Sequence, residues 1–306
     1  MNVSGRLQRV VERALAESID VHTMTTLARR LFGSYDLNER TGFPKSLVIP
    51  NKNAAGQIVR DIREKGLFLD FVTLLIEIHE VGLKGRKYRI PYLREIVGEL
   101  NKEGLVFDEA TRMFFEDPGL RKSRDWGVLR EGLEYFFTFL RVDIVGNTDL
   151  VRRNSSEAVQ NTYEYLRGNV QGTVERRNGR IWNWEGDGGL AVFHFSNMEN
   201  RAALCAMEIL NELYIYNLTQ CELNDPLSVR IAVHCGPCEY RKSPDELNGE
   251  TIKSVNELES KRTKTNAITF SGILCRGLSP IIVERLERVS DDGYGVCYSY
   301  EIRWEN

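Results

Sequence analysis

Residues 139–148 read FLRVDIVGNT, and residues 184–193 read WEGDGGLAVF. Each stretch is rich in apolar, β-branched and aromatic residues and carries one aspartate close to a glycine, Asp143 in the first and Asp187 in the second. A carboxylate in an apolar strand is costly unless it is paired or bound to a cation. Two of them, 44 residues apart, predict a shared divalent-metal site, where oxygen ligands favour magnesium or manganese.

The composition is typical of a globular protein of two domains. The 306 residues are 42% hydrophobic and 28% charged, and the net charge of −3 gives no electrostatic argument for a nucleic acid or a membrane as partner. The longest apolar run, residues 67–78, is interrupted by Asp70 and Glu77, so we expect no membrane span. The chain shows no secretory signal, and its six cysteines fit reduced thiols, so a cytoplasmic location is expected.

The sequence pattern changes near residue 120. Residues 1–120 repeat apolar positions at helical spacing, which predicts a helical regulatory or interaction domain. Helices are expected there over residues 51–63, 67–81, 91–100 and 108–115. Residues 121–306 alternate strands with long helices, which predicts an α+β catalytic domain with one sheet and helices packed on it.

In the second domain, the run over residues 136–144 is too apolar for a half-exposed strand, so we expect it at the centre of the sheet. Two capping-box patterns predict helices that end near residues 177 and 217. Further elements are expected as a strand pair over residues 227–234 and 238–241, strands over 268–270 and 294–302, and a helix over 281–288.

Three elements of the chain resemble class III nucleotidyl cyclases and occur in that family's order. Residues 143–148 match D-I-x-G-x-T, residues 186–193 match G-D-G-x-x-A-x-F, and residues 230–237 match R-I-x-x-H-x-G-P. The resemblance covers about residues 135–306. It implies a class III cyclase-like, antiparallel-rich sheet with packed helices and two Mn²⁺ or Mg²⁺ ions per active site.

The resemblance also implies roles for the two aspartates. Asp143, Asp187 and the carbonyl of Ile144 would hold two cations that clamp a nucleoside triphosphate and activate its 3′-hydroxyl. A strand meets a helix directly after Asp143, where N–H groups can hold phosphate oxygens. The residues at this junction are Gly146, Asn147 and Thr148. The competing interpretation makes both aspartates ordinary turn or cap residues.

Asn183 departs from the purine cyclases of the family, which have an adenine-reading lysine four residues before the second aspartate. An amide offers both a donor and an acceptor and can match a pyrimidine edge, while the neighbouring indole of Trp184 or Trp182 can fill the space left by a smaller ring. The alternative is that both tryptophans pack on the covered face of the sheet and Asn183 is a solvated strand residue.

The family's transition-state element, G-x-x-V-N-x-x-x-R-L-E, corresponds to residues 249–259 in one of two registers. Alignment on Leu-Glu places Lys253 and Glu257 at the Asn and Arg positions, whereas alignment on Val-Asn keeps Asn256 and leaves Lys261 or Arg262 as the cation. A cation near the transferring phosphate is expected in either register.

Cys235-Gly236-Pro237-Cys238 has the letters of a C-x-x-C redox motif. Such a motif needs a helix N-terminus to lower the pKa of the first thiol, and strands are expected on both sides of this one. Redox chemistry is therefore not expected. The four histidines have no metal-ligand spacing.

A class III cyclase core without the adenine-reading lysine resembles the pyrimidine cyclases of bacterial Pycsar antiphage defence. This resemblance implies a homodimer that converts UTP to cyclic UMP as a signal to a separate cyclic-nucleotide-gated effector. Three alternatives stay open: a cytidylate cyclase, a purine cyclase with relocated base contacts, and a degenerate cyclase-like domain that binds nucleotide without turnover.

Overall fold

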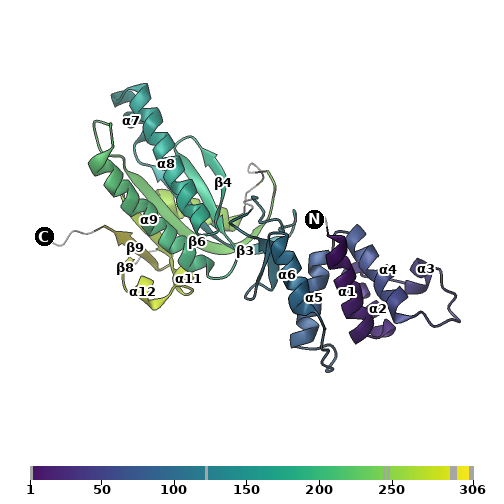
Figure 1. Ribbon diagram of the computed structural model, residues 1–306. Helices are drawn as coiled ribbons and strands as arrows, with labels where there is room; N and C mark the ends of the chain where they lie inside the picture. The colour runs from purple at the N-terminus through teal and green to yellow at the C-terminus, as the bar shows by residue number, and fades with distance from the viewer. Residues whose placement is uncertain (1–2, 121–122, 244–245, 247–248, 290–294, 303–306) are drawn as a thin grey trace. The chain divides into compact units, whose positions relative to one another are not determined.

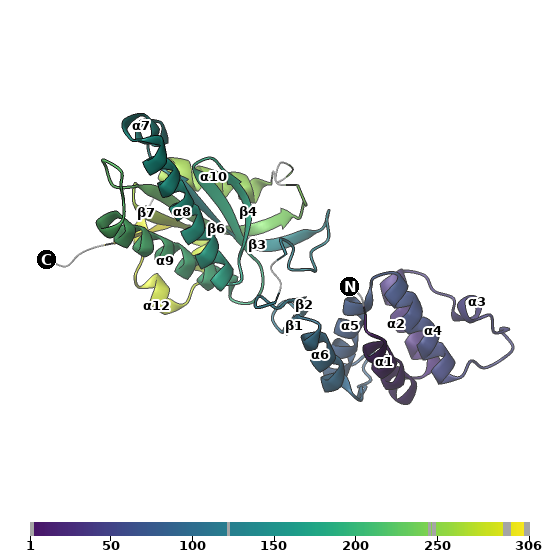
Figure 2. The same ribbon diagram turned by 45° about the horizontal axis from the view of Figure 1, so that its top comes forward.

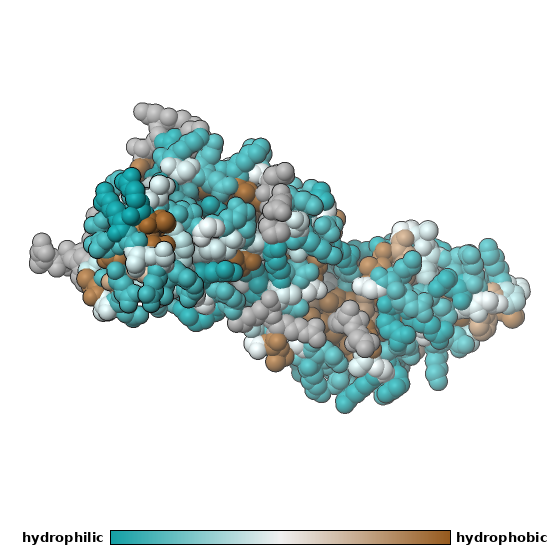
Figure 3. All heavy atoms as spheres, turned by 90° about the horizontal axis from the view of Figure 1, so that it is seen from above, coloured by the Kyte–Doolittle hydropathy of each residue, from teal (hydrophilic) through white to brown (hydrophobic). Residues whose placement is uncertain are grey.

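The computed structural model describes residues 3–120, 123–243, 246, 249–289 and 295–302. The chain divides into two compact units, Met1–Arg121 and Lys122–Asn306, and each unit has a hydrophobic core of its own. On the face seen in Figure 3, hydrophilic side chains predominate over both units. Among the described residues, no helix is long and apolar enough to cross a membrane.

Helices make up most of the first unit (Figure 1). Ser4 and Asp20 begin the first two helices, because their side-chain oxygens accept hydrogen bonds from the N–H groups of Leu7 and Thr23, at 3.2 and 2.8 Å. The helices are α1 Gly5–Ser18, α2 Val21–Phe32, α3 Leu37–Thr41, α4 Asn51–Glu64, α5 Phe68–Glu80 and α6 Leu93–Lys102.

A β-hairpin follows these helices, so the helix expected over residues 108–115 is wrong. Strand β1, Leu105–Asp108, pairs antiparallel with β2, Met113–Glu116. The paired rings of Phe107 and Phe114 lie 5.0 Å apart, and Phe114 joins the core of the first unit. Cross-strand pairing thus buries Phe114 and part of Phe107 in place of a helical face.

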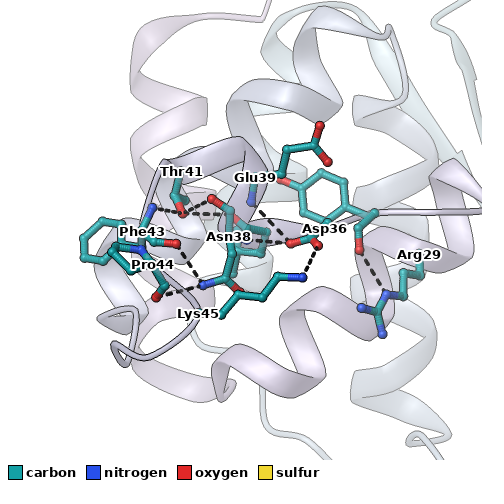
Figure 4. Close-up of polar contacts among 10 residues, drawn as sticks. Arg29, Asp36, Asn38, Glu39, Thr41, Phe43, Pro44 and Lys45 are labelled. Carbon is teal, nitrogen blue, oxygen red and sulfur yellow. Dashed lines mark hydrogen bonds and ion pairs between the residues drawn. The ribbon is translucent and has the colours of Figure 1, made fainter.

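A polar network holds the loop after α3 (Figure 4). Asp36 begins the helix by accepting hydrogen bonds from the N–H groups of Asn38 and Glu39, at 3.0 and 3.3 Å. The side-chain amide of Asn38 then donates to the carbonyl oxygens of Phe43 and Pro44, at 3.1 and 3.4 Å. This loop carries none of the predicted site residues.

The second unit is built on one sheet with the strand order β4-β5-β3-β6-β7-β9-β8. Strands β6 and β7 are parallel, and the other described pairs are antiparallel. The strands are β3 Glu134–Ile144, β4 Arg180–Glu185, β5 Gly188–Phe193, β6 Val229–Glu239, β7 Ala267–Ser271, β8 Glu287–Val289 and β9 Cys297–Glu301. The predicted α+β class is confirmed, and so is the interior position of β3.

Two long helices, α8 Ser156–Arg176 and α9 Met198–Thr219, lie side by side on one face of the sheet (Figures 1 and 2). They bury the side chains of Leu140, Val142 and Ile144, and we call this the α8/α9 face. Because strand side chains alternate, Phe139, Arg141 and Asp143 lie on the opposite face.

Helix α10, Glu250–Arg262, packs on that opposite face, which we call the α10 face. A Cβ at Gly236 of β6 would lie 2.7 Å from Oγ1 of Thr251 in α10, so the helix approaches the strand there at a distance that only glycine permits. The other helices of this unit are α7 Asn147–Arg153, α11 Gly272–Cys275 and α12 Pro280–Val283.

Two further elements differ from the sequence-based expectation. Strand β6 is continuous and pairs with β3 as far as Glu239, so the expected pair of strands over residues 227–234 and 238–241 is wrong. Gly236-Pro237 lies within the strand because its residues pair with Phe137 and Phe136 of β3. Helix α12 is shorter than the expected helix over residues 281–288, since β8 begins at Glu287. Tyr294, where the last strand was expected to begin, lies outside the described residues.

Candidate active site

Asp143 lies at the end of β3 on the α10 face, between two neighbouring strands. It pairs with Gly188 of β5 on one side and with Arg230 of β6 on the other. Its Oδ2 accepts a hydrogen bond from Nη2 of Arg230 at 2.8 Å, and its side chain is 19% exposed. The guanidinium offsets the desolvation cost of the partly buried carboxylate. The hydrogen bond uses Oδ2 of Asp143 and not Oδ1.

Asp187 reaches the same end of the sheet through a two-residue turn. Glu185 and Gly188 pair with each other, so the turn consists of Gly186 and Asp187, and Gly186 has a positive φ of 54°. Because Gly188 also pairs with Asp143, the turn brings the second aspartate next to the strand end that carries the first.

The start of α7 is tied to α8 by a hydrogen bond, in which the hydroxyl of Tyr163 donates to Oδ1 of Asn147. Burial raises the pKa of Tyr163, the hydrogen bond with Asn147 opposes this shift, and the charge of Asp187 adds to it. Asp187 thus acts electrostatically on the tyrosine that contacts the start of α7.

Gly188 lies in close contact with the end of β3 that carries Asp143. A Cβ at this position would lie 3.1 Å from Oδ1 of Asp143 and 2.9 Å from the carbonyl oxygen of Val142. A side chain here would therefore force a shift of β3 or of its side chains, so glycine permits the close approach of β5 to the strand end that carries Asp143.

The donors at this site fit a hard divalent cation. Asp143, Asp187 and the main-chain carbonyl of Ile144 offer oxygen only, which suits Mg²⁺ or Mn²⁺. In the part of the chain that the structure describes, no group of three or more His, Cys, Asp or Glu side chains could hold a metal. Cations at this site would therefore need further oxygens from phosphate or water, which is usual for magnesium.

Arg230 connects Asp143 to α10, a contact that the sequence reasoning missed. Its Nε lies 2.6 Å from Oε1 of Glu259, close enough for an ion pair although the geometry is not that of a hydrogen bond. Burial raises the pKa of Glu259 and Asp143 adds to this shift, while Arg230 opposes it. Arg230 is the first residue of the R-I-x-x-H-x-G-P match, so this motif could have marked it as a site residue.

A β-bulge in β4 sets the direction of the side chains around Asn183. The register with β5 shifts between Ile181 and Asn183, so two consecutive side chains turn to the α10 face. Trp182 packs there, 4.9 Å from the ring of Phe137, and Asn183 pairs with Leu190 on the same face. Trp184 lies on the other face, in the α8/α9 core.

Asn183 is partly exposed, and one end of its amide is engaged. Nδ2 donates to Oε1 of Glu185 at 2.6 Å, which leaves Oδ1 as the acceptor of that side chain. Trp184 covers the backbone of Gly189, where a Cβ would meet the indole at 2.3 Å. The two tryptophans thus lie on opposite faces, and Trp182 is the one that shares a face with Asn183.

The candidate transition-state residues of α10 are not gathered at Asp143. Lys253 and Asn256 are exposed, and Lys253 pairs with Glu250 at 2.8 Å. Lys261 and Arg262 line a cavity of about 690 Å³ together with His234, Ser271 and Tyr298. Neither aspartate lines this cavity.

The C-x-x-C sequence does not form a redox pair. Cys235 lies in the α8/α9 core, and Cys238, three residues along the same strand, lies on the opposite face. Burial raises the pKa of Cys235 to about 12 and that of Cys238 to about 11. Both thiols therefore stay protonated at neutral pH, and neither is activated as a nucleophile.

The solved structures that resemble this chain include nucleotide cyclases. The catalytic core of a rhodopsin-guanylyl cyclase with converted specificity, in complex with ATPalphaS, has 19% identity and a TM-score of 0.48 over 55% of this chain and 96% of its own. The guanylyl cyclase Cya2 has 20% identity and a TM-score of 0.47 over 56% of this chain and 93% of its own. An adenylate/guanylate cyclase/hydrolase from Silicibacter pomeroyi has 18% identity and a TM-score of 0.48 over 56% of this chain and 99% of its own.

No protein-family model matches the chain, and no curated protein matches it. At such identities and TM-scores, the likeness to the solved structures carries no weight for activity or substrate.

Proposed function

We propose that the second unit is a pyrimidine nucleotide cyclase that converts UTP to 3′,5′-cyclic UMP and pyrophosphate. The proposal rests on the pairing of Asp143 with Gly188, which brings the turn of Asp187 to the same strand end. Two carboxylates at the same end of the sheet, one on β3 and one in the turn before β5, suit a site that holds a metal-bound triphosphate.

Two divalent cations, when bound, would supply activation of the ribose 3′-hydroxyl and neutralisation of charge on the phosphates. The protein's own contribution is positioning. Arg230 orients Asp143, and the short turn at Gly186 sets the direction of Asp187. By the resemblance, the N–H groups at the start of α7, from Gly146 to Thr148, would hold phosphate oxygens.

The preference for a pyrimidine rests on Asn183. With Nδ2 held by Glu185, Oδ1 can accept from N3–H of uracil or from the amino group of cytosine. UTP remains the proposed substrate and CTP the nearest competitor. A purine is larger than a pyrimidine and would need more space beside Asn183 on the α10 face. Trp182 lies on that face and is already packed against Phe137.

As a pyrimidine cyclase, the protein would supply a soluble second messenger. By the resemblance of its sequence to the Pycsar cyclases, we propose that cyclic UMP made during phage infection activates a separate effector. The first unit, with its own core, would regulate the second or bind a partner. Lys253, Asn256 and Arg262 would act from a second copy of the chain in a homodimer.

The test is incubation of the purified chain with each of the four ribonucleoside triphosphates and Mn²⁺, with products identified by mass spectrometry. Cyclic UMP as the main product supports the proposal, and cyclic CMP would change the substrate to CTP. The control is Asp187→Ala, which must be inactive. If the wild-type protein makes no cyclic nucleotide, the proposed activity is refuted. The alternative of a domain that binds nucleotide without turnover would then stand.

A further inference from the structure

A cavity of about 270 Å³ lies between α8 and β4, the strand at the edge of the sheet. Helix and strand are in contact there (Figures 1 and 2). Asp143, Asp187 and Asn183 are not among the described residues that line this cavity. It is therefore separate from the predicted metal ligands and from the predicted base contact.

Three arginines from three separate segments line the cavity. Arg124 stands before β3, Arg167 on α8 and Arg180 at the start of β4. Among the described lining residues, Glu175 alone is acidic, and it accepts a hydrogen bond from Gln171 at 2.9 Å. The lining thus carries an excess of positive charge in a chain whose net charge is −3. Positive charges brought together in a cavity attract an anion.

The charge and the donors of Arg124 are only partly balanced within the protein. Its Nη1 donates to the carbonyl oxygen of Lys242 at 3.2 Å, while its Nη2 has no hydrogen-bond partner in the part of the chain that the structure describes. Burial lowers the pKa of Arg124, and the group that opposes this shift is the phenol of Tyr240 rather than a carboxylate. A partly buried guanidinium in such surroundings is stabilised by an anionic ligand.

The other two arginines differ in how firmly they are held. Arg180 is 3% exposed, and its Nε and Nη1 donate to the carbonyl oxygens of Ser123 and Gly179, at 2.6 and 2.9 Å. Arg167 is exposed and makes no side-chain hydrogen bond or ion pair with the described residues. The cavity therefore combines a buried guanidinium in a fixed position with an exposed one that is available to a ligand.

We propose that this cavity binds a small phosphate-bearing anion. Guanidinium groups match the geometry of phosphate oxygens and donate charge-assisted hydrogen bonds to them. The indole of Trp184, which also lines the cavity, offers a flat apolar surface beside these donors. Inorganic phosphate and the phosphate group of a small ester share this chemistry. The inference uses none of the predicted metal ligands and does not depend on the proposed function.

The experiment measures anion binding to the whole chain without metal. Purified protein in phosphate-free buffer is titrated by calorimetry with inorganic phosphate, with phenyl phosphate and with sodium chloride of equal ionic strength. EDTA is present, so that phosphate cannot bind through a cation at the candidate active site.

Four variants report on the cavity. Arg124→Gln and Arg167→Gln each remove one positive charge from the lining, and Glu175→Gln removes the negative one. Arg176→Gln is the matched control, because Arg176 lies on the same helix, is exposed and pairs with Glu208. Thermal unfolding checks that each variant is folded. Arg167 is exposed, so its variant tests the proposal even if Arg124→Gln does not fold.

In the wild type, phosphate binding is expected to saturate with a dissociation constant of about 1 mM or tighter. Arg124→Gln and Arg167→Gln should each weaken it by about tenfold, because a charge-assisted hydrogen bond is lost. Glu175→Gln should tighten binding, and Arg176→Gln should leave it unchanged. Tighter binding of phenyl phosphate than of inorganic phosphate would assign the site to an ester that contacts Trp184, and the reverse order would assign it to the free ion.

Two results would overturn the proposal. One is a wild type that shows no saturable phosphate binding up to about 10 mM beyond the effect of chloride. The other is equal phosphate binding in the wild type, Arg124→Gln and Arg167→Gln, which would place the anion elsewhere on the protein. A protein that binds phosphate in this cavity but makes no cyclic nucleotide would refute the proposed function and support the phosphate site.

Discussion

At the scale of single residues, Asp143 has close neighbours on both adjacent strands. Arg230 of β6 donates a hydrogen bond to its Oδ2 at 2.8 Å, and Gly188 of β5 lies so close that a Cβ there would be 3.1 Å from its Oδ1. A metal ion bound by Asp143 would therefore share the carboxylate with Arg230. Loss of Asp143 should affect both the ion pair and the predicted metal site, and measurements of stability and of activity distinguish the two effects.

Asp143→Ala and Asp187→Ala are each expected to abolish Mn²⁺-dependent cyclisation while the protein stays folded. Asp187 stands in a turn, so its loss should not change the melting temperature measurably. Loss of Asp143 also frees Arg230 and should cost about 1–3 kcal/mol. Product formation and thermal unfolding are measured together. Asp149→Ala, which removes an exposed carboxylate paired with Arg152, is the active control, and near-normal turnover in either variant would exclude that aspartate as a ligand.

Asn183→Ala is expected to reduce discrimination between UTP and CTP more than it weakens triphosphate binding. A buried site built to form hydrogen bonds rejects a base that leaves a polar group unpaired, and this rejection is lost with the amide. Product ratios in a mixture of the four triphosphates measure the effect. Glu185→Gln, which keeps a side-chain acceptor for Nδ2, is the matched control. Unchanged product ratios in Asn183→Ala would show that residues other than Asn183 recognise the base.

At the scale of elements, buried polar clusters connect helices to one another. In the first unit, Asp61 of α4 is 3% exposed and accepts hydrogen bonds from Tyr35 and Arg40, at 2.6 and 3.0 Å, and from Gln57 at 2.9 Å. Burial acts to raise the pKa of Asp61, but these hydrogen bonds outweigh it and lower the pKa. The cluster links α4 to the chain around α3.

This shift predicts an acid-sensitive first unit. The folded-state pKa of Asp61 lies below its unfolded value of about 3.9, so its contribution is present above that pH and is lost as the pH falls through the folded-state value. Hydrogen exchange of α4 amides should therefore accelerate as the pH drops below about 4, after correction for the intrinsic rate. Asp61→Asn should flatten this dependence, whereas Glu64→Gln on the same helix should not. An identical acid response in Asp61→Asn and the wild type would contradict the assignment.

At the scale of the whole molecule, the candidate site residues are divided over the second unit. The aspartates stand at the end of β3, while Lys261 and Arg262 line a separate cavity of about 690 Å³. In one copy of the chain these groups do not form a single site. An active site completed by a second copy would bring aspartates and cations together, as expected for a dimer with two-fold symmetry.

Mixed dimers provide the test. Asp187→Ala chains and chains with Lys253, Lys261 and Arg262 all changed to alanine should each be inactive as pure dimers. After verified subunit exchange, the mixture should recover about a quarter of the wild-type rate, since half of the random dimers carry one intact site of two. The exposed ion pairs lost in the triple variant cost little stability, about 0–1 kcal/mol each. A mixture that stays inactive would count against shared sites.

Local sequence patterns determined much of the second unit. Apolarity predicted β3 as an interior strand, because this feature depends on neighbouring residues only. The capping pattern over residues 154–157 predicted the helix α8, but Ser155, and not the first residue of the pattern, is its N-cap, with its hydroxyl accepting from the N–H of Ala158 at 3.2 Å. The metal role of Asp143 and Asp187 and the base-reading role of Asn183 stay predictions.

Only the tertiary structure decided how the strands pair. The hairpin of β1 and β2 replaced an expected helix, β6 runs straight through Gly236-Pro237, and the bulge in β4 sends Trp182 and Trp184 to opposite faces. The contact of Arg230 with Asp143 likewise depends on the pairing of β6 with β3. The physical reason is that pairing, register and bulges depend on hydrogen bonds and packing between strands, which the periodicity of a single segment does not encode.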